Sequence, residues 1–186
     1  MADLRRGNTA RTSWLAIGNS KSYGDSAHCD SGILVRSRES ARILSFDAQS
    51  GMLKAEPGVT LGDIILHAGP HGWFLPVTPG TKHVTLGGAI ANDVHGKNHH
   101  RRGSFGAHVI SFDLLRSDGV TRRCSAQEHM NLFQATIGGF GLTGMITSAA
   151  IQLMKVGTSD VREQVTPFKS LEEYLALAEG ADQGNE

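Results

Sequence analysis

The amino-acid sequence predicts an α+β fold of two lobes in which strands and helices are mixed. Strand-like apolar runs and capped helical segments do not alternate one for one, which disfavours a doubly wound parallel sheet. Tight-turn sequences between neighbouring strand-like runs predict antiparallel pairing. Glycine is the one outlier in composition, with 23 of 186 residues, against an average usage of about 7%. Because glycine is favoured where the backbone lies directly against a ligand, its clusters indicate a large ligand on bare main chain.

The predicted strands are short, and turns connect them. Gln49-Ser50-Gly51 and Ser117-Asp118-Gly119 each stand between strand-like runs, and the second carries the stronger Asp-Gly signal. Both therefore predict antiparallel hairpins. The runs that pattern and composition mark as strands are 14–17, 32–35, 43–46, 52–55, 109–116 and 146–154.

Three helices are predicted from capping boxes, in which a side-chain oxygen and an acidic residue three positions later bond the first free amides. The first helix is expected to stop at Gly69-Pro70 and the second to cover 126–137. The third is expected to end before Gly180, followed by a polar tail over 181–186 in which order fades. The capping pairs are Thr60 with Asp63, Ser125 with Glu128, and Ser170 with Glu173.

Two changes in composition divide the chain. A weak joint falls near Val59, between a hairpin region and the first helix, and a clearer one falls near Val156-Gly157-Thr158. We therefore expect a first lobe over 1–59 and a second lobe over 60–156. Residues 157–186 are expected to be either a tail or the start of a truncated substrate (cap) domain.

Composition and charge exclude several classes of function. Eighteen Lys and Arg balance 18 Asp and Glu, so the cationic field of a nucleic-acid binder is absent. No apolar run approaches the roughly 20 residues of a membrane span, and no signal-peptide core follows the basic start at Arg5, Arg6 and Arg11. Cys29 and Cys124 alone cannot make a disulfide framework or a four-ligand zinc site. The sequence thus predicts a soluble, cytoplasmic protein.

The first candidate binding segment is the loop of small residues at 18–26, directly after the strand at 14–17. Successive backbone amides in such a loop form a concave nest that can hold a pyrophosphate, and Lys21 could assist. The alternative is an ordinary surface turn rich in serine and glycine.

The second candidate segment runs from 76 to 100 and contains a short predicted helix over 85–91. The N-terminus of this helix and its Gly87-Gly88 pair would let a flat or anionic group approach the backbone. Each glycine costs a helix roughly 1 kcal/mol relative to alanine, so a compensating contact is expected. That contact is either a ligand or a closely packed neighbouring element.

Three histidines of this segment, His95, His99 and His100, raise a metal hypothesis. No cysteine or carboxylate accompanies them at zinc-finger spacing, and the neighbouring lysine and arginines would repel a divalent cation. A solvated basic loop that touches phosphate is the favoured interpretation, and no metal site is predicted.

The third candidate segment, 138–144, contains a literal GxGxxG. A Rossmann dinucleotide fingerprint needs a strand before the glycines and a helix after them, whereas the predicted order here is the reverse. The glycines therefore predict close backbone approach at a loop that leads into a buried strand.

In this order and spacing, the three segments are similar to the flavin-binding domain of the FAD-linked oxidases, the family that includes vanillyl-alcohol oxidase and the sugar-lactone oxidases. The similarity is greatest to the decaprenylphosphoryl-ribose oxidase group. It covers residues from about 14 to 154, and the joint match of all three segments makes it specific. The sequences that carry it are GNSKSYGDSA (18–27), LPVTPGTKHVTLGGAIANDVHGKNHHRRGSFG (75–106) and LFQATIGGFGLTGMI (132–146).

The resemblance implies a two-lobed PCMH-type FAD-binding domain with FAD stretched between the lobes and its pyrophosphate on the 18–26 loop. It implies that Tyr23 and His95 face the reacting substrate in catalytic positions. It also implies that Asn92 lies near the flavin and that Ile146 contacts the adenine through its backbone. The residues that it assigns to cofactor binding are Gly18, Asn19, Ser20, Lys21, Ser22, Tyr23, Gly24, Asp25, Ser26, Gly80, Thr85, Gly87, Gly88, Asn92, His95 and Ile146.

Two departures from the family pattern shape these expectations. Many lactone oxidases place a histidine at the position of Lys21 and link it covalently to the flavin, so the resemblance here implies non-covalent FAD. Relatives also close the flavin pocket with a substrate domain and a later return segment, whereas this sequence ends at Glu186. We therefore expect a fragment or an unusually short relative.

The residue types suit the implied chemistry. Oxidation of an alcohol needs hydride transfer to the flavin and removal of the hydroxyl proton. His95 offers an imidazole as general base or hydrogen-bonding group, but its alternative role is to fill the cavity and bond a backbone carbonyl. A structural hydrogen bond is likewise the alternative for Tyr23.

The function implied is that of the FAD-binding portion of an oxidoreductase that oxidises a secondary alcohol of a sugar. A decaprenylphosphoryl-ribose-like substrate comes first and an aldonolactone second. A flavin-dependent reductase of cell-wall precursor synthesis, a flavin-binding module without catalysis and a structural interaction domain are the alternatives. The expected partners are a small-molecule sugar or lipid-linked sugar substrate and a partner reductase, with no nucleic acid.

Overall fold

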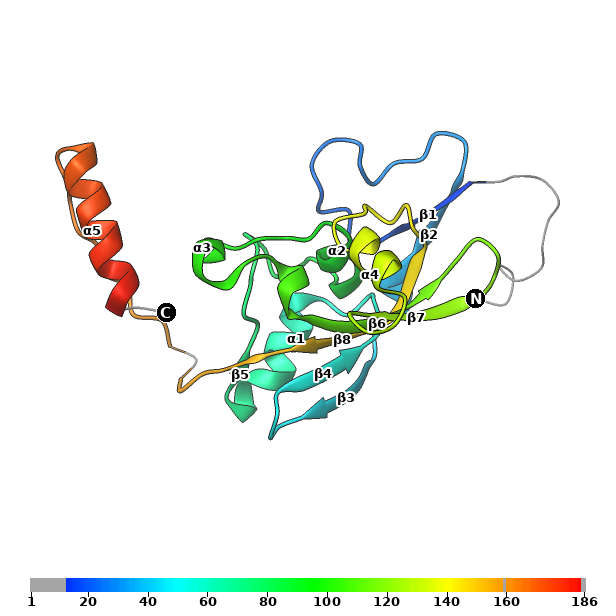
Figure 1. Ribbon diagram of the computed structural model, residues 1–186, viewed down its shortest axis with the longest axis horizontal. Coiled ribbons are helices and arrows are strands. Elements are labelled where there is room, and N and C mark those ends of the chain that lie inside the picture. Colours follow the sequence, from blue (N-terminus) through cyan, green and yellow to red (C-terminus); the bar gives the residue numbers. More distant parts are fainter. Residues whose placement is uncertain (1–12, 159, 185–186) are drawn as a thin grey trace.

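The largest element of the fold is a five-stranded antiparallel sheet with strand order β3-β4-β8-β6-β7 (Figure 1). The computed structural model describes residues 13–158 and 160–184, so the basic residues Arg5, Arg6 and Arg11 lie outside the described residues. This sheet and the helices described below confirm the predicted α+β fold. Its strands are β3 (Ile43–Asp47), β4 (Met52–Ala55), β6 (Val109–Leu115), β7 (Thr121–Ser125) and β8 (Met145–Gln152).

Both predicted hairpins are confirmed. The turn between β3 and β4 places Gly51 at φ +74°, and a Cβ there would lie 2.2 Å from the Trp73 ring. In the turn between β6 and β7, Gly119 has φ +78°. Hydrogen bonds from the Arg122 side chain and the Val120 amide lower the pKa of Asp118 from 3.8 to about 2. The carboxylate therefore stays charged and holds this turn at neutral pH.

Two smaller sheets complete the strand arrangement. β1 (Trp14–Ile17) and β2 (Ile33–Arg36) pair in parallel, and β5 (Trp73–Phe74) pairs antiparallel with β9 (Met154–Lys155). The parallel pairing was not predicted, because its partners are joined by a 15-residue loop at 18–32 rather than by a tight turn. The predicted strand 146–154 is divided at Leu153 into β8 and β9.

The first capping box is confirmed. Helix α1 (Leu61–Ala68) begins after Thr60, whose Oγ1 accepts from the Asp63 amide at 3.1 Å, while the Asp63 carboxylate accepts from the Thr60 amide at 2.9 Å. The helix ends at Gly69, as predicted. Helix α2 (Leu86–Ala91) likewise agrees with the predicted helix over 85–91, and Thr85 is its N-cap.

The second capping box was wrong. Helix α4 spans Met130–Thr136 rather than 126–137, and its N-cap is His129 at φ +51°. Ser125 Oγ does accept from the Gln127 and Glu128 amides, but the Ser125 amide donates to the Glu128 carbonyl at 2.8 Å. Because Ser125 still belongs to β7, these bonds close a turn in place of the first helical turn.

The third helix is longer than predicted. Helix α5 (Leu171–Gly184) continues through Gly180, since one glycine costs a helix only about 1 kcal/mol and helix-compatible residues follow it. The expected polar tail is thus helical over 181–184, and 185–186 lie outside the described residues. Ser170 caps the helix by accepting from the Glu173 amide, but the Glu173 carboxylate accepts from the Lys169 amide instead of closing the box. Figure 1 shows α5 apart from the sheet.

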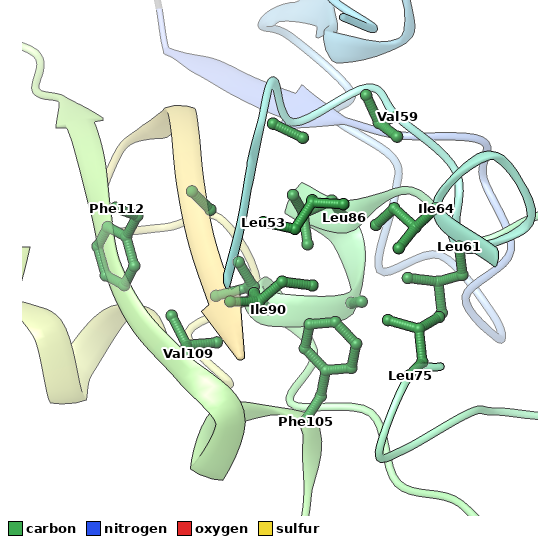
Figure 2. Packing of buried hydrophobic residues seen from close by; sticks show 14 of the residues in the cluster. Leu53, Val59, Leu61, Ile64, Leu75, Leu86, Ile90, Phe105, Val109 and Phe112 are labelled. Carbon is green, nitrogen blue, oxygen red and sulfur yellow. The ribbon is translucent and has the colours of Figure 1, made fainter. Parts of the chain in front are cut away.

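The hydrophobic core lies between the five-stranded sheet and helices α1 and α2. Figure 2 shows Leu86 and Ile90 of α2 in the middle of this cluster, near Leu53 of β4. Both helices lie N-terminal to β6 and β8 in sequence, so the core joins distant parts of the chain. The five-stranded sheet itself contains residues from both sides of the joint expected near Val59. Short elements outside it are α3 (His99–Arg102) and 3₁₀ turns at Ser37–Glu39, Gly69–His71 and Phe105–His108.

The helices of the described residues are not of the kind that crosses a membrane. Over residues 13–158 and 160–184, each helix is too short or too polar to span a bilayer.

Candidate cofactor-binding site

The three candidate segments of the sequence meet at one cavity of about 700 Å³. The 18–26 loop, the segment that includes α2, and the loop before β8 all contribute to its wall. Gly24 and Asp25 are the two predicted cofactor residues that do not line it; Gly24 turns the loop at φ +62°, and the Asp25 carbonyl accepts from the His28 amide. The predicted residues on the wall are Gly18, Asn19, Ser20, Lys21, Ser22, Tyr23, Ser26, Gly80, Thr85, Gly87, Gly88, Asn92, His95 and Ile146.

The backbone amides of the 18–26 loop are free to bond a ligand. Within the described part of the chain, no residue accepts a hydrogen bond from any backbone amide between Gly18 and Ser26. Ser20 at φ +50° and Gly24 at φ +62° turn the loop by left-handed backbone. Successive unpaired amides in such a loop form an anion-binding concavity, and the amino group of exposed Lys21 adds a positive charge to the wall.

Two side chains tie this loop to the second segment. Asn19 Nδ2 donates to the His83 carbonyl at 2.9 Å, and Ser22 Oγ makes a longer contact of 3.4 Å with Asn92 Oδ1. A Cβ on Gly18 would lie 2.2 Å from Thr85 Oγ1, so glycine is required where the loop crosses the N-cap of α2.

The N-terminus of α2 does not offer free amides to an anion, which corrects the sequence-based expectation. The Leu86 amide donates to the Val59 carbonyl and the Gly87 amide to the Pro57 carbonyl, at 2.7 and 2.9 Å. The Gly88 amide donates to Thr85 Oγ1 at 3.2 Å. With these amides already bonded within the protein, the unpaired amides of the 18–26 loop are the better anion site.

The two adjacent glycines of α2 are needed for different reasons. A Cβ on Gly87 would lie 2.8 Å from Pro57 Cβ, which is close packing of α2 against another segment. A Cβ on Gly88 would meet only its own N-cap oxygen, Thr85 Oγ1, at 3.0 Å. Gly88 also lines the cavity, so its missing side chain leaves room for a ligand.

Tyr23 and His95, the two predicted catalytic residues, both lie on the cavity wall and are exposed. The Tyr23 side chain is 99% exposed. In the described residues, neither the Tyr23 hydroxyl nor the His95 imidazole has a hydrogen-bond partner. These side chains therefore do not serve as structural hydrogen-bonding groups within the described structure.

The three histidines considered for a metal do not converge with other ligands. The His95 and His99 ring centroids are 5.9 Å apart, and those of His99 and His100 are 6.3 Å apart. Among the described residues, no three or more His, Cys, Asp or Glu side chains are arranged to hold a metal ion.

Sequence reasoning missed Asp93, which holds the loop that carries His95. Asp93 has φ +42°, and its carboxylate accepts from Ser104 Oγ and the Gly106 amide, both at 2.8 Å. A Cβ on Gly106 would lie 2.8 Å from the Asp93 carboxylate, so glycine is needed there. The partners of Asp93 are 11 and 13 residues away in sequence, beyond the reach of any local turn signal.

The lining of the cavity fits FAD. Unpaired amides and Lys21 suit a pyrophosphate, while Gly80 and Gly88 leave space for rings beside the main chain. A volume of about 700 Å³ lies within the range of small-molecule and cofactor sites.

Comparison with known proteins also indicates FAD binding. The family described as FAD binding domain matches residues 4–125. Over 172 residues, the chain is 40% identical to decaprenylphosphoryl-beta-D-ribose oxidase of Mycolicibacterium smegmatis, covering 92% of this chain and 37% of that protein. It is 27% identical over 168 residues to human Delta(24)-sterol reductase, covering 90% of this chain and 31% of the reductase. It is 26% identical over 136 residues to mouse L-gulonolactone oxidase, covering 73% of this chain and 30% of the oxidase.

The chain spans about a third of the length of these curated relatives. Within its own length, however, the match is nearly complete, and it includes all three segments that line the cavity. On that similarity and on the family match over most of its residues, this protein belongs to the FAD binding domain family.

Proposed function

We propose that this chain is the FAD-binding portion of an oxidoreductase that oxidises a secondary alcohol of a sugar. The observation that carries the proposal is the cavity. Its wall includes the unpaired amides of the 18–26 loop and the part of α2 where Gly88 has no side chain. The relative with 40% identity, a decaprenylphosphoryl-beta-D-ribose oxidase by name, supports a lipid-linked sugar as substrate.

Separate parts of the cavity wall would hold separate parts of the cofactor. The 18–26 amides and Lys21 would bind the pyrophosphate through hydrogen bonds and charge. Gly88 and Asn92 would lie against the flavin ring, and the Asn92 side chain is already oriented by its 2.8 Å bond to the Gly88 carbonyl. FAD, when bound, supplies the hydride acceptor for oxidation of the alcohol carbon.

The proton of the substrate hydroxyl needs a separate acceptor. His95 is suited to this role because its ring nitrogens have no partner among the described residues and its side chain lines the cavity. Tyr23 would donate or accept a hydrogen bond at the substrate from the rim. Both side chains are exposed, so whatever covers this face of the cavity would also exclude water from the reacting groups.

The proposed FAD is non-covalent, because Lys21 stands where many lactone oxidases carry the histidine that is linked to flavin. Acid or heat denaturation of the loaded protein is expected to release all flavin into the supernatant. Flavin fluorescence that stays with the protein band on a denaturing gel would contradict this proposal.

The proposed reaction is tested by reducing the bound flavin with substrate. The chain, together with its sequence continuation if it has one, is loaded with FAD and mixed without oxygen with a polyprenyl-phosphoryl sugar or with an aldonolactone. Loss of the visible flavin absorbance with the lipid-linked sugar is the expected result. Loss with the aldonolactone alone would favour the alternative that the L-gulonolactone oxidase similarity suggests.

A second candidate function is a flavin-binding module without catalysis. The exposure of Tyr23 and His95 favours it, since neither side chain is held in a closed site. Protein that binds FAD tightly, yet fails to reduce it with either class of sugar alcohol, would establish this alternative. Protein that binds no FAD at all would overturn both functions.

A further inference from the structure

The loop between α4 and β8 places one large side chain, Phe140, on the cavity wall. Phe140 has φ +53°, which is left-handed backbone that a phenylalanine rarely adopts. Its side chain is also 53% exposed. An aromatic residue that is both strained and exposed at a cavity indicates a role that the fold itself does not require.

The position of Phe140 is closely determined. Its amide donates to the Ala91 carbonyl at 2.8 Å, and the Gly138 amide donates to the Ile90 carbonyl at 3.0 Å. A Cβ on Gly139 would lie 2.2 Å from the Ala135 carbonyl oxygen, so that residue cannot carry a side chain without a shift. Gly141 has φ +78°. Among these four consecutive residues, position 140 alone carries a side chain.

Two aromatic rings of the core are partners of each other, in contrast to Phe140. Phe112 and Phe133 stack with ring centroids 5.1 Å apart inside the core. In the part of the chain that the structure describes, the Phe140 ring has no aromatic partner. Because Phe140 is 53% exposed and lines the cavity, part of its ring is available to a planar ligand group.

The part of the wall around Phe140 differs from the part that carries the predicted catalytic residues. A Cβ on Gly141 would lie 3.4 Å from Leu15 Cδ1 and 3.5 Å from the Ala16 carbonyl, which places this loop beside β1 (Figure 1). None of the wall residues from β1 and from 136–146 is titratable, whereas the wall elsewhere includes Lys21, Tyr23 and His95. The former are Ala16, Ile17, Thr136, Phe140, Gly141, Gly144 and Ile146.

We infer that Phe140 stacks on the adenine ring of the bound dinucleotide. The inference rests on the proposed function, because it requires FAD in this cavity. Adenine takes no part in the redox step and needs no proton donor or acceptor with catalytic function, so it suits the non-titratable part of the wall. The flavin ring then lies toward His95 and Tyr23. Stacking on a ligand also explains why a strained, exposed phenylalanine occupies a position that glycine would fill without strain.

The test measures binding of three ligands to the 186-residue chain freed of flavin. FAD carries both rings, ADP carries adenine with the pyrophosphate, and FMN carries the flavin ring without adenine. The variants are Phe140→Ala, Phe140→Gly and Phe140→Trp. Leu142→Ala is the matched control, since Leu142 is 84% exposed in the same loop and does not line the cavity. Dissociation constants come from fluorescence or calorimetric titration, and thermal unfolding verifies that each variant folds.

Phe140→Ala is expected to weaken FAD and ADP binding by roughly 5- to 150-fold, the range for loss of one aromatic–base stack, and to change FMN binding less than twofold. Phe140→Gly should weaken FAD binding to a similar extent while raising the melting temperature, because glycine adopts φ +53° without strain. Phe140→Trp should retain affinity, and Leu142→Ala should bind like the wild type.

Two results would overturn the inference while leaving the proposed function intact. The first is unchanged FAD affinity in both Phe140→Ala and Phe140→Gly. The second is a loss of FMN affinity equal to the loss for FAD, which would place the flavin ring against Phe140. A wild-type chain that binds neither FAD nor ADP would instead overturn the proposed function, and the inference with it.

Discussion

Single residues at the cavity are explained by what a side chain would meet at each position. Gly18 and Gly87 are bare because Thr85 and Pro57 pack against them. Gly88 is bare for another reason, since the space beside it belongs to the cavity. Two adjacent glycines thus differ in role, since one allows close packing and the other keeps the cavity open.

Gly88→Val is predicted to abolish FAD uptake. The branched side chain would extend from α2 into the space that the cofactor needs, while no other segment lies within 4 Å to clash with the new Cβ. FAD binding is measured by titration and folding by circular dichroism. Gly157→Val is the control, since Gly157 lies outside the cavity with nothing within 4 Å. Wild-type FAD uptake by a folded Gly88→Val protein would argue against this placement of the cofactor.

His95→Ala is predicted to spare FAD binding more than turnover. The His95 side chain is exposed and has no hydrogen-bond partner in the described residues, so removing it costs little stability. If it accepts the hydroxyl proton, the rate of flavin reduction by substrate should fall roughly 100- to 10,000-fold. His83→Ala is the control, because His83 is exposed and does not line the cavity. Equal losses of binding and reduction would mean that His95 has a structural role.

At the scale of elements, the loop after α2 shows how a side chain can anchor a functional segment. The loop from Val94 to Ser104 carries His95 and is closed at its base by the bonds of Asp93 and by the Phe105 amide, which donates to the Val94 carbonyl. Asn98 Nδ2 further ties the loop to the Pro76 carbonyl at 3.1 Å. These bonds hold His95 at the cavity wall in place of helix or sheet hydrogen bonds.

Asp93→Ala is predicted to loosen this loop and to destabilise the fold by about 3 kcal/mol, since two hydrogen bonds to a charged group are lost. Trypsin should then cleave after Lys97 faster than in the wild type, and FAD affinity should fall. Denaturant unfolding, mass spectrometry of the fragments and FAD titration provide the measurements.

Two further variants separate this anchoring role from a general effect of removing charge. Asp93→Asn can keep both bonds and should restore most of the protection from trypsin. Asp30→Ala removes an exposed carboxylate that pairs with His28 and should leave cleavage after Lys97 unchanged. Wild-type cleavage in Asp93→Ala would show that the carboxylate does not anchor the loop.

The helices show where local sequence signals are sufficient. Thr60 belongs to none of the strands, so a helix can begin after it, and both hydrogen bonds of the capping box form. At Ser125 the same signal is present, yet the residue is already paired in β7, and the turn that follows delays α4 to Met130. A capping-box sequence therefore specifies which backbone amides the side chain can bond. Whether a helix begins there depends on whether the capping residue is already paired in a strand.

At the scale of the whole molecule, the cavity couples cofactor binding to folding. Its wall combines β1, the 18–26 loop, α2 and the loop before β8, which are brought together only in the folded chain. A ligand that binds all of them has no site in the unfolded chain. Cofactor binding should therefore stabilise the folded state by mass action.

FAD at 100 times its dissociation constant is predicted to stabilise the protein by about 2.7 kcal/mol. For a chain of this length, the melting temperature should rise by roughly 5–10 °C. The measurement is thermal unfolding of flavin-free protein at increasing FAD concentration, with Gly88→Val as a variant that should show no shift. A melting temperature independent of FAD in the wild type would contradict binding at this cavity.

The sequence by itself determined the local features of this protein. Hairpin turns, the capping box of α1, the short helix α2 and the three glycine-rich segments depend on residues within a few positions of one another. The joint pattern of those segments was enough to predict the FAD binding domain family, which the comparisons confirm.

The tertiary structure alone decided which backbone groups remain free and which glycine faces the cavity. The amides at the start of α2 are bonded to Val59 and Pro57, while those of 18–26 are not, and only the packed chain reveals that difference. The parallel pairing of β1 with β2, the anchoring by Asp93 and the exposed ring of Phe140 likewise depend on contacts between distant residues. Such contacts leave no local signal, because their energy arises only after separate elements have met.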